Sequence, residues 1–232
     1  MTRPFPFKIA FSDLVNHSMA DLLNQYGLIH VYDTPKLTAD QYHQWGEQIG
    51  KLLIGHRHLA NAEGTVHDIS SGAALQDKSL PWHNDYSYGR GDYFGSALYN
   101  VENGHMCDTE FADMTIIPEE IKAVYRGVIA SHRIPDSFTQ EFTDREREIL
   151  DRRYAKHPLV SVHPNGMETV YCSPASIVDD IDIAPIVDWS ERHSYVHKWV
   201  DGDLLFWDNR QLMHRRGPLL GPRRMWRIQF IL

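Results

Sequence analysis

Hydrophobic and polar residues alternate along most of this chain in short runs, a pattern that predicts β-strands. Clusters of Gly, Pro, Asn and Asp, the residues that most often form turns, separate the runs. From about residue 65 onward the runs follow one another at the spacing typical of a sandwich or jelly roll. The predicted strands span residues 28–32, 65–70, 82–88, 93–101, 159–163, 167–172, 203–207 and 224–231.

Helical periodicity is strongest in the front third of the chain. Apolar side chains recur at helical spacing over residues 17–26, and Gly27 is a natural end for that helix. Thr38 and Gln41 form a capping-box-like pattern that predicts the start of a second helix. We expect this second helix to run to about Leu53.

Two further helices interrupt the β-rich part, one over 118–128 and a charged, solvent-exposed one over 144–154. We therefore expect an α+β, mainly β fold: a double-stranded β-helix (jelly roll, cupin-like) with flanking helices and a helical insert. The expected organisation is one domain over the whole chain. Within it, residues 1–64 form an α/β buttress and residues 65–232 the jelly-roll core, with the insert at about 115–156.

Composition narrows the class of protein. The chain has 232 residues, of which 42% are hydrophobic and 11% aromatic, as expected for a packed globule. A net charge of -8 disfavours nucleic acid or an anionic membrane as the main partner. Cys107 and Cys172 are too few for a disulfide framework, and the sequence shows neither a signal-peptide core nor an apolar run of about 18 residues. We expect a cytoplasmic protein that acts on small molecules, with no nucleic acid or membrane partner.

Two distant segments carry the candidate chemistry. His83 and Asp85 stand two residues apart, so on an extended strand both side chains leave the same face. Beyond a predicted buried strand and a polar turn lies His214, which a closed β-sandwich would bring beside them. Two imidazoles and one carboxylate form the facial triad of non-haem Fe(II) oxygenases, which leaves positions open for a chelating cosubstrate and dioxygen. Taken singly, each motif also fits a surface strand with ordinary hydrogen bonds.

Further motifs make the pattern specific. The chain resembles the taurine dioxygenase / 2,4-D dioxygenase (TauD/TfdA-like) family of Fe(II)- and 2-oxoglutarate-dependent enzymes. Three blocks and an arginine-rich final strand carry the resemblance, in the family's order and close to its spacing. They are Trp-His-x-Asp at 82–85, Asp-Thr at 108–109, Gly-Asp-Leu…Trp-Asp-Asn-Arg…His at 202–214 and the final strand at 223–227.

The resemblance implies Fe(II), 2-oxoglutarate and O2 as cofactors, with the metal held by His83, Asp85 and His214. It also implies that Thr109 hydrogen-bonds the distal carboxylate of 2-oxoglutarate and that Trp207, Asp208 and Asn209 fix the turn before the last ligand. Asn84 is expected to face away from the metal and orient its loop.

An arginine near the end of such chains pairs with the same distal carboxylate, because a guanidinium binds a carboxylate bidentately and stays charged. Arg223 and Arg227 reproduce the family's four-residue spacing, both about two residues nearer to His214 than is common. We expect Arg223 to be the anchor, with Arg227 as its helper or as a contact to an acidic group of the substrate. Arg224, which should face the other way, is the fallback.

Substrate contacts are less defined. His56, His58 and His67 precede the first ligand, where relatives contact substrate, although a structural or surface role is favoured for them. The intact Asp85 favours hydroxylation over halogenation, since related halogenating enzymes carry a small residue there. We expect oxidation of an unactivated C–H bond in a small polar, anionic or amino acid-like metabolite, with release of succinate and CO2.

Other outcomes stay open at this point. The same cofactor chemistry can give desaturation, cyclisation or cleavage of a substrate bond in natural-product biosynthesis. The same three ligands could instead build a zinc-dependent hydrolase, or the fold could serve as a non-catalytic sensor of a small acid. A homo-oligomer also stays open, because oligomers are common in the resembled family.

Overall fold

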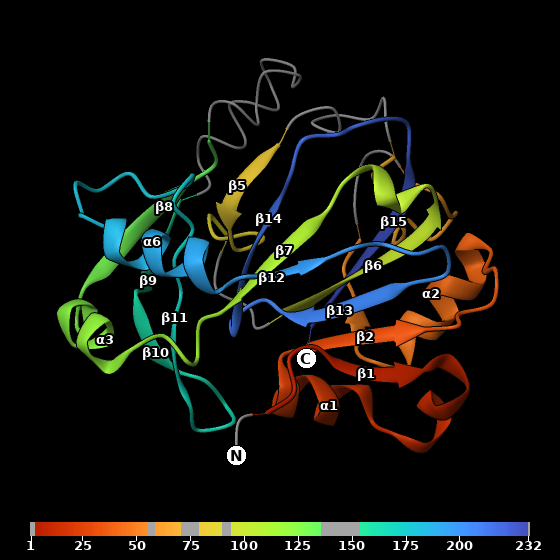
Figure 1. Ribbon diagram of the computed structural model, residues 1–232, viewed down its shortest axis with the longest axis horizontal. Helices are drawn as coiled ribbons and strands as arrows, with labels where there is room; N and C mark the ends of the chain where they lie inside the picture. The colour runs from red at the N-terminus through yellow and green to blue at the C-terminus, as the bar shows by residue number, and fades with distance from the viewer. Residues whose placement is uncertain (1–2, 55–58, 71–78, 90–93, 136–153, 232) are drawn as a thin grey trace.

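The structure is a computed structural model that describes residues 3–54, 59–70, 79–89, 94–135 and 154–231 (Figure 1). Most of the described chain forms two β-sheets and a lobe beside them (Figure 1). None of the described helices combines the length and the apolar composition that crossing a membrane requires.

The larger sheet has seven strands. These are β1 (Phe7–Ala10), β2 (Leu28–Tyr32), β3 (Lys51–Leu52), β4 (His67–Asp68), β6 (Phe94–Glu102), β13 (Leu204–Asp208) and β15 (Arg224–Ile231). Their order is β1-β2-β13-β6-β15-β3, and β4 also pairs with β15. Only the β1–β2 pair is parallel within this sheet, while every other pair is antiparallel.

The smaller sheet has four antiparallel strands. These are β5 (Leu80–His83), β7 (Thr109–Asp113), β12 (Tyr195–His197) and β14 (Leu212–Arg216), in the order β12-β7-β14-β5. Side chains from both sheets pack into one apolar cluster. Its members include Leu98, Leu205 and Met225 from the larger sheet and Phe111 and Leu212 from the smaller one. This shared cluster holds the two sheets face to face.

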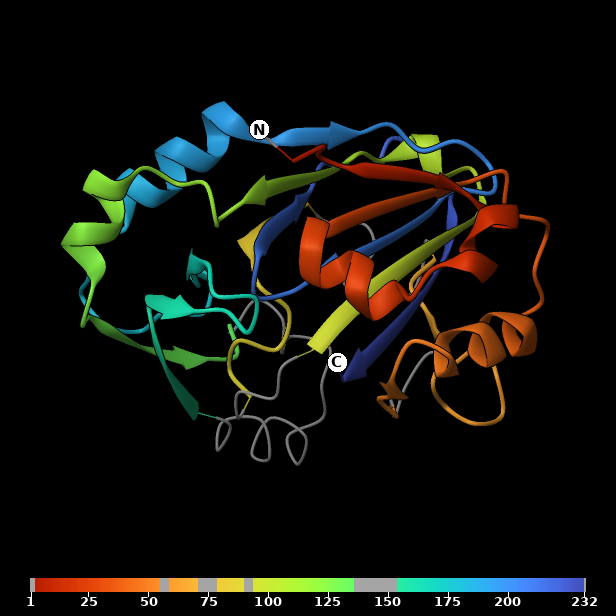
Figure 2. The ribbon, with the colours of Figure 1, turned by 90° about the horizontal axis from the view of Figure 1, so that it is seen from below.

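Two helices cover the other face of the larger sheet (Figure 2). They are α1 (Met19–Tyr26) and α2 (Ala39–Glu47), and a 3-10 helix, η1 (Phe11–Asn16), precedes them. Ser18 caps α1, and Gly27 ends it at a φ of 75° that favours glycine. The expected capping box at the start of α2 is present, because Thr38 accepts from the Gln41 amide and the Gln41 side chain accepts from the Thr38 amide.

The lobe beside the sheets contains the middle of the chain (Figures 1 and 2). Its elements are α3 (Glu119–Tyr125), β8 (Ile129–Arg133), β9 (Tyr154–Pro158), β10 (Val160–Val162), β11 (Glu168–Val170) and α6 (Ala184–His193). A short 3-10 helix, η2 (Gly104–Met106), lies outside the lobe. The predicted strands at 159–163 and 167–172 exist as β10 and β11, but they pair with each other and not with either large sheet. Trp82 and Met213 of the smaller sheet pack against α6 residues Ile186 and Trp189 in a common cluster.

Some predicted boundaries are wrong. The second helix ends at Glu47 and not at about Leu53, because Leu52 pairs with Phe230 of β15 in strand β3. Gly50 makes this pairing feasible, since a Cβ there would lie 2.2 Å from the Ile231 carbonyl oxygen. The predicted strand 82–88 is shifted, because β5 ends at His83 and a turn follows. The predicted helix 144–154 lies outside the described residues, except for Tyr154, which begins β9.

Candidate metal centre and cosubstrate site

The two histidines of the candidate triad are direct neighbours across the smaller sheet. His83 is the last residue of β5 and His214 the middle residue of β14, and the two are paired in register. Their ring centroids lie 4.2 Å apart. The predicted polar turn is therefore followed by a strand, and that strand presents His214.

Asp85 completes the group from the turn that follows β5. Its Oδ1 lies 3.6 Å from His83 Nε2 and 3.8 Å from His214 Nε2. One ligand atom from each of the three residues lies within 4.8 Å of the others; Asp85 and His214 are buried, and the His83 side chain is 12% exposed. The sequence expectation that these residues come together is met, although Asp85 lies in a turn and not on the strand.

The neighbouring turn between β13 and β14 fixes the position of the Asp85 backbone. Asn209 Oδ1 accepts from the Asp85 amide at 2.8 Å, and Asn209 Nδ2 donates to the Asp85 carbonyl at 2.9 Å. Asn84 Nδ2 donates to the carbonyls of Asn209 and Leu212. Asp208 accepts from the amides of Arg210 and Gln211, which closes the turn. These contacts agree with the orienting roles expected for the asparagines and for Asp208.

The larger sheet orients the carboxylate itself. Ser96 on β6 donates to Asp85 Oδ2 at 2.9 Å, and Gln229 on β15 donates to the same oxygen at 3.3 Å. With Oδ2 occupied by these donors, Oδ1 faces the two imidazoles. Arg227 Nη1 also lies 3.8 Å from Oδ1. The centre is thus built from both sheets.

The histidine ring orientations suit a metal. His83 Nδ1 lies 2.8 Å from the Pro81 carbonyl, so this nitrogen carries the proton and Nε2 keeps its lone pair. His214 packs between Trp207 and Phe111, with ring centroids at 4.9 and 5.9 Å. Its buried Nδ1 has no hydrogen-bond partner among the described residues. Both Nε2 atoms are the ones that face Asp85.

Electrostatics also favour a cation. Burial raises the pKa of Asp85, but the hydrogen bond to His83 and the charges of His214 and Arg227 outweigh it and hold that pKa well below its ordinary range. Burial, reinforced by the neighbouring His83, lowers the pKa of His214 to about 3. At neutral pH the group therefore offers one ionised carboxylate and at least one neutral imidazole, and both are forms that bind metal.

Thr109 lies at the start of β7, one strand away from β5 across β14. It is buried, and its register partner on β14 is Arg216. Trp199 Nε1 donates to Thr109 Oγ1 at 3.0 Å, which leaves the threonine hydroxyl hydrogen available for an acceptor. This fits a side chain that donates to a carboxylate.

The three candidate arginines have different surroundings. Arg223 is only 4% exposed and lies just before β15, whereas Arg224 is exposed and stacks on Trp226 at 5.3 Å. Arg227 is half-buried and reaches the metal centre through its contact with Asp85. Arg224 therefore points away from the centre, as expected for a residue that faces the opposite side of the strand from Arg223 and Arg227.

Sequence reasoning missed a fourth arginine, Arg216, which is buried opposite Thr109 on β14. A usable signal existed, because His214 and Arg216 are two residues apart and share a strand face. Arg215 points the other way, where it stacks on Trp82 and pairs with Glu110 at 2.8 Å.

Of the three histidines suggested as substrate contacts, one lies among the described residues. His67 lies on β4 and pairs in register with Arg227, so it is next to the centre in the sheet. His56 and His58 lie outside the described residues.

Two histidines and one carboxylate that converge at a pair of facing β-sheets form the ligand set of the non-haem Fe(II) oxygenases. The family model for the taurine catabolism dioxygenase TauD, TfdA family matches residues 3–229. The chain belongs to this family. It is an Fe(II)/2-oxoglutarate-dependent dioxygenase, with 2-oxoglutarate and O2 as cosubstrates. This result favours the oxygenase over the hydrolase and the sensor.

Named relatives are distant in sequence. The chain is 26% identical over 242 residues to an (S)-phenoxypropionate/alpha-ketoglutarate-dioxygenase from Delftia acidovorans, covering 87% of this chain and 81% of the relative. It is 25% identical over 157 residues to the alpha-ketoglutarate-dependent 2,4-dichlorophenoxyacetate dioxygenase of Cupriavidus pinatubonensis, covering 58% and 53% of the two chains.

Solved structures show the same fold. A putative alpha-ketoglutarate-dependent taurine dioxygenase from Burkholderia xenovorans superposes with a TM-score of 0.72 at 20% identity, covering 100% of this chain and 87% of that one. AAD-2, solved with Mn(II) and N-oxalylglycine, gives a TM-score of 0.68 at 22% identity, covering 100% and 91%. The fold is therefore of the jelly-roll type found in TauD-like dioxygenases.

Proposed function

We propose that this enzyme hydroxylates an unactivated C–H bond of a small anionic metabolite at a centre formed by His83, Asp85 and His214. The observation that carries the proposal is the convergence of these three side chains, with Arg227 Nη1 3.8 Å from the carboxylate. We also propose that the facing sheets form a double-stranded β-helix and that residues 1–232 are a single domain.

In this proposal His83 Nε2, His214 Nε2 and Asp85 Oδ1 hold the iron. Bound iron and 2-oxoglutarate supply the chemistry, in which O2 is consumed, 2-oxoglutarate gives succinate and CO2, and the substrate C–H bond is oxidised. The protein's own task is to hold the ligands and to exclude other reactions. Ser96 and Gln229 keep one carboxylate oxygen occupied, so that the other stays directed at the metal.

Arg223 and Thr109 are the proposed anchors for the distal carboxylate of 2-oxoglutarate. Both are buried, so a charged contact between them and the cosubstrate would be shielded from water. Arg216 lies opposite Thr109, and Arg216 and Arg223 both act on the pKa of Cys107, two residues before Thr109. Positive charge is thus concentrated where a dicarboxylate would end.

The charges of the centre support an anionic substrate. An Fe(II) ion with Arg216, Arg223 and Arg227 brings five formal positive charges, and Asp85 with the 2-oxoglutarate dianion brings three negative ones. Two positive charges are left, and Arg227 is a half-buried cation in contact with the metal ligand Asp85. Its Nε has no hydrogen-bond partner among the described residues. Two relatives named above are described as dioxygenases of carboxylic acids, (S)-phenoxypropionate and 2,4-dichlorophenoxyacetate.

The first test is an anaerobic titration of the metal-free protein with Fe(II) and then 2-oxoglutarate, followed by visible absorption. We expect a weak charge-transfer band that requires both additions and is absent in His83→Ala. Tight zinc binding without this band would instead favour the hydrolase, and binding of 2-oxoglutarate without any metal would favour the sensor.

Substrate class is tested by succinate release with a panel of small carboxylates, sulfonates and amino acids, each paired with its neutral amide or ester. We expect acids to stimulate release and their neutral partners not to. Equal stimulation by both members of each pair would contradict the anionic class. Product mass then separates hydroxylation, a gain of one oxygen, from desaturation, cyclisation or cleavage.

A further inference from the structure

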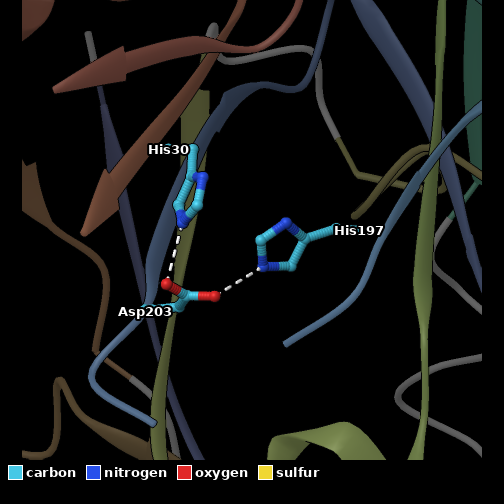
Figure 3. A group of neighbouring side chains, drawn as sticks. All are labelled: His30, His197 and Asp203. Carbon is cyan, nitrogen blue, oxygen red and sulfur yellow. Dashed lines mark hydrogen bonds and ion pairs between the residues drawn. The ribbon is translucent and has the colours of Figure 1, made fainter. Parts of the chain in front are cut away.

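A second group of metal-ligating side chains lies away from the centre described above. His30 comes from β2 of the larger sheet, His197 from β12 of the smaller sheet, and Asp203 from the turn just before β13 (Figure 3). One ligand atom from each lies within 4.8 Å of the others. Nothing in the proposed reaction uses these residues.

The two imidazoles meet on one carboxylate (Figure 3). His30 Nε2 lies 2.8 Å from Asp203 Oδ1, and His197 Nε2 lies 3.1 Å from Asp203 Oδ2. The three side chains are largely buried, with exposures of 12%, 2% and 6% for His30, His197 and Asp203. Such a pairing of two histidines and an aspartate is the donor set that suits zinc and related divalent metals.

The outer contacts resemble those of metal-binding side chains. Histidines that bind metals generally use their second ring nitrogen for a hydrogen bond that fixes the ring. His197 Nδ1 makes such a contact with the Tyr195 hydroxyl at 3.2 Å, and Trp199 packs edge-on against the same ring at 4.6 Å. The Val200 amide donates to Asp203 Oδ2 at 2.9 Å and fixes the carboxylate. His30 differs from His197 in this respect, because its Nδ1 is buried without a hydrogen-bond partner among the described residues.

Charge at the group favours a cation. Burial raises the pKa of Asp203, but hydrogen bonds to His197 and His30 outweigh it and hold that pKa below its ordinary range, so the carboxylate is ionised at neutral pH. Burial lowers the pKa of His197, which is therefore neutral there. Lys8 is the cation outside the group that acts on His197, and its charge is the last of the causes that lower the pKa of this histidine. A buried carboxylate beside a neutral imidazole is a favourable place for a metal ion.

The distances require only a small adjustment. With zinc–nitrogen and zinc–oxygen bonds of about 2.0–2.2 Å, ligand atoms around a tetrahedral ion lie roughly 3.3–3.5 Å apart. An ion bound to one Asp203 oxygen would take the place of the hydrogen bonds that the two imidazoles make with this carboxylate, and the 2.8 Å contact of His30 Nε2 with Oδ1 would have to open by about half an ångström. The fourth position would fall to water, since three protein ligands leave one open.

We propose that His30, His197 and Asp203 bind a second divalent transition-metal ion, with zinc as the best match to the donor set. This site is separate from the iron centre and shares no residue with it. An ion there would join β2 of one sheet to β12 of the other.

The test counts zinc ions bound by the chelator-stripped full chain, without 2-oxoglutarate. A competing chelator of micromolar zinc affinity removes ions held by single surface histidines. The decisive variant is His30→Gln, because the glutamine amide can still donate to Asp203 while it is a poor zinc ligand. His43→Gln is the matched control, since His43 is 13% exposed against 12% for His30 and belongs to neither group.

We expect two zinc ions for the wild-type protein and for His43→Gln, one for His30→Gln, and one for His83→Gln, which retains only the second site. The double variant His30→Gln/His83→Gln should bind none. The same zinc count in His30→Gln as in the wild-type protein would overturn the proposal. His197→Gln provides a repeat of the same count from the other histidine. Loss of the proposed iron site alone would leave the His30-dependent ion in place, so the two proposals fail separately.

Discussion

At the scale of single residues, the two oxygens of the Asp85 carboxylate have different partners. Oδ2 receives hydrogen bonds from Ser96 and Gln229, and Oδ1 faces the histidines. Loss of a group that orients a metal ligand typically lowers metal affinity or activity 10- to 100-fold. The Ser96 hydroxyl should therefore matter for metal binding although it touches no metal.

We predict that Ser96→Ala weakens Fe(II) binding by about 10- to 100-fold, because Oδ2 loses its shorter hydrogen bond. Anaerobic equilibrium dialysis measures this affinity. Ser190→Ala is the control, since Ser190 is equally buried but donates to the Ile186 carbonyl in α6. Equal effects of the two substitutions would show that the loss is general and not a property of Asp85.

The arginines allow a second prediction at this scale. Arg223→Gln should weaken 2-oxoglutarate binding by about 10- to 150-fold, because a charge-assisted contact contributes about 1.5–3 kcal/mol. Arg224→Gln should leave this affinity unchanged, since Arg224 is exposed and stacks on Trp226. Fluorescence-detected binding to the Fe(II)-loaded protein separates the two. A normal affinity in Arg223→Gln would move the anchor to Arg216 or Arg227.

Site residues can be predicted from the sequence where they belong to a short local motif. His83 and Asp85 are two positions apart and His214 follows a distinctive turn, so all three can be recognised without coordinates. His30 and His197 carry no such local motif. They meet Asp203 only because β2 and β12 belong to different sheets that come together in the fold.

At the scale of elements, the turn between β13 and β14 fixes the turn after β5. Two hydrogen bonds between the Asn209 side chain and the Asp85 backbone make this connection, one accepted and one donated by Asn209. Both bonds are buried, so their loss leaves a polar backbone group without a partner. The two turns therefore behave as one unit.

We predict that Asn209→Ala lowers the free energy of unfolding by about 2–4 kcal/mol, with urea denaturation of the metal-free protein as the measurement. Asn165→Ala is the matched control, because Asn165 also makes two side-chain hydrogen bonds, to the Asn24 carbonyl and from the Met167 amide, but in a more exposed turn. Its expected cost is about 1 kcal/mol. A similar cost for both variants would contradict the special role of the Asn209 turn.

Element prediction succeeded where one strand face is apolar throughout, even when the other face carries inward polar residues such as Gln229, and failed where both faces carry polar residues. The runs that became β2, β6, β13 and β15 were predicted within one or two residues. By contrast, β7 and β14 were missed, since Thr109, His214 and Arg216 interrupt their apolar pattern at positions that face the centre. Helix α6 was also missed, and α2 was extended too far because strand pairing with β15 overrides its helical pattern.

At the scale of the whole molecule, buried histidines set the response to acid. His132 is fully buried in the lobe, its Nδ1 lies 2.8 Å from Ser176 Oγ, and the His157 ring lies 5.3 Å away at an interplanar angle of 55°. Burial, assisted by the charge of His157, lowers the pKa of His132 to about 4. The unfolded chain takes up this proton near pH 6.5, so it binds more protons than the folded chain between pH 6.5 and pH 4.

Stability should therefore fall as the pH drops through this window, and His132 should account for about 3 kcal/mol of the loss. Its stabilising contribution is fully present above pH 6.5. In His132→Gln this part of the decrease in the free energy of unfolding with falling pH should disappear, as measured by urea denaturation at half-unit pH steps. His157, His197 and His214, whose pKa values are also lowered by burial, would keep the remaining slope. An unchanged slope in the variant would contradict the assignment.

The proposed iron centre lies between the two sheets, with His83 and His214 on one sheet and the donors to Asp85 on the other. An ion held there resists separation of the sheets, so it would make the molecule mechanically stiffer as well as active. Anaerobic Fe(II) at about 100 times its dissociation constant should raise the stability by about 2.7 kcal/mol. Amide exchange should slow most in β5 and β14, and uniform slowing would argue against this. On warming, the three ligand side chains of the metal-free enzyme should therefore separate at a lower temperature than the one at which the whole chain unfolds.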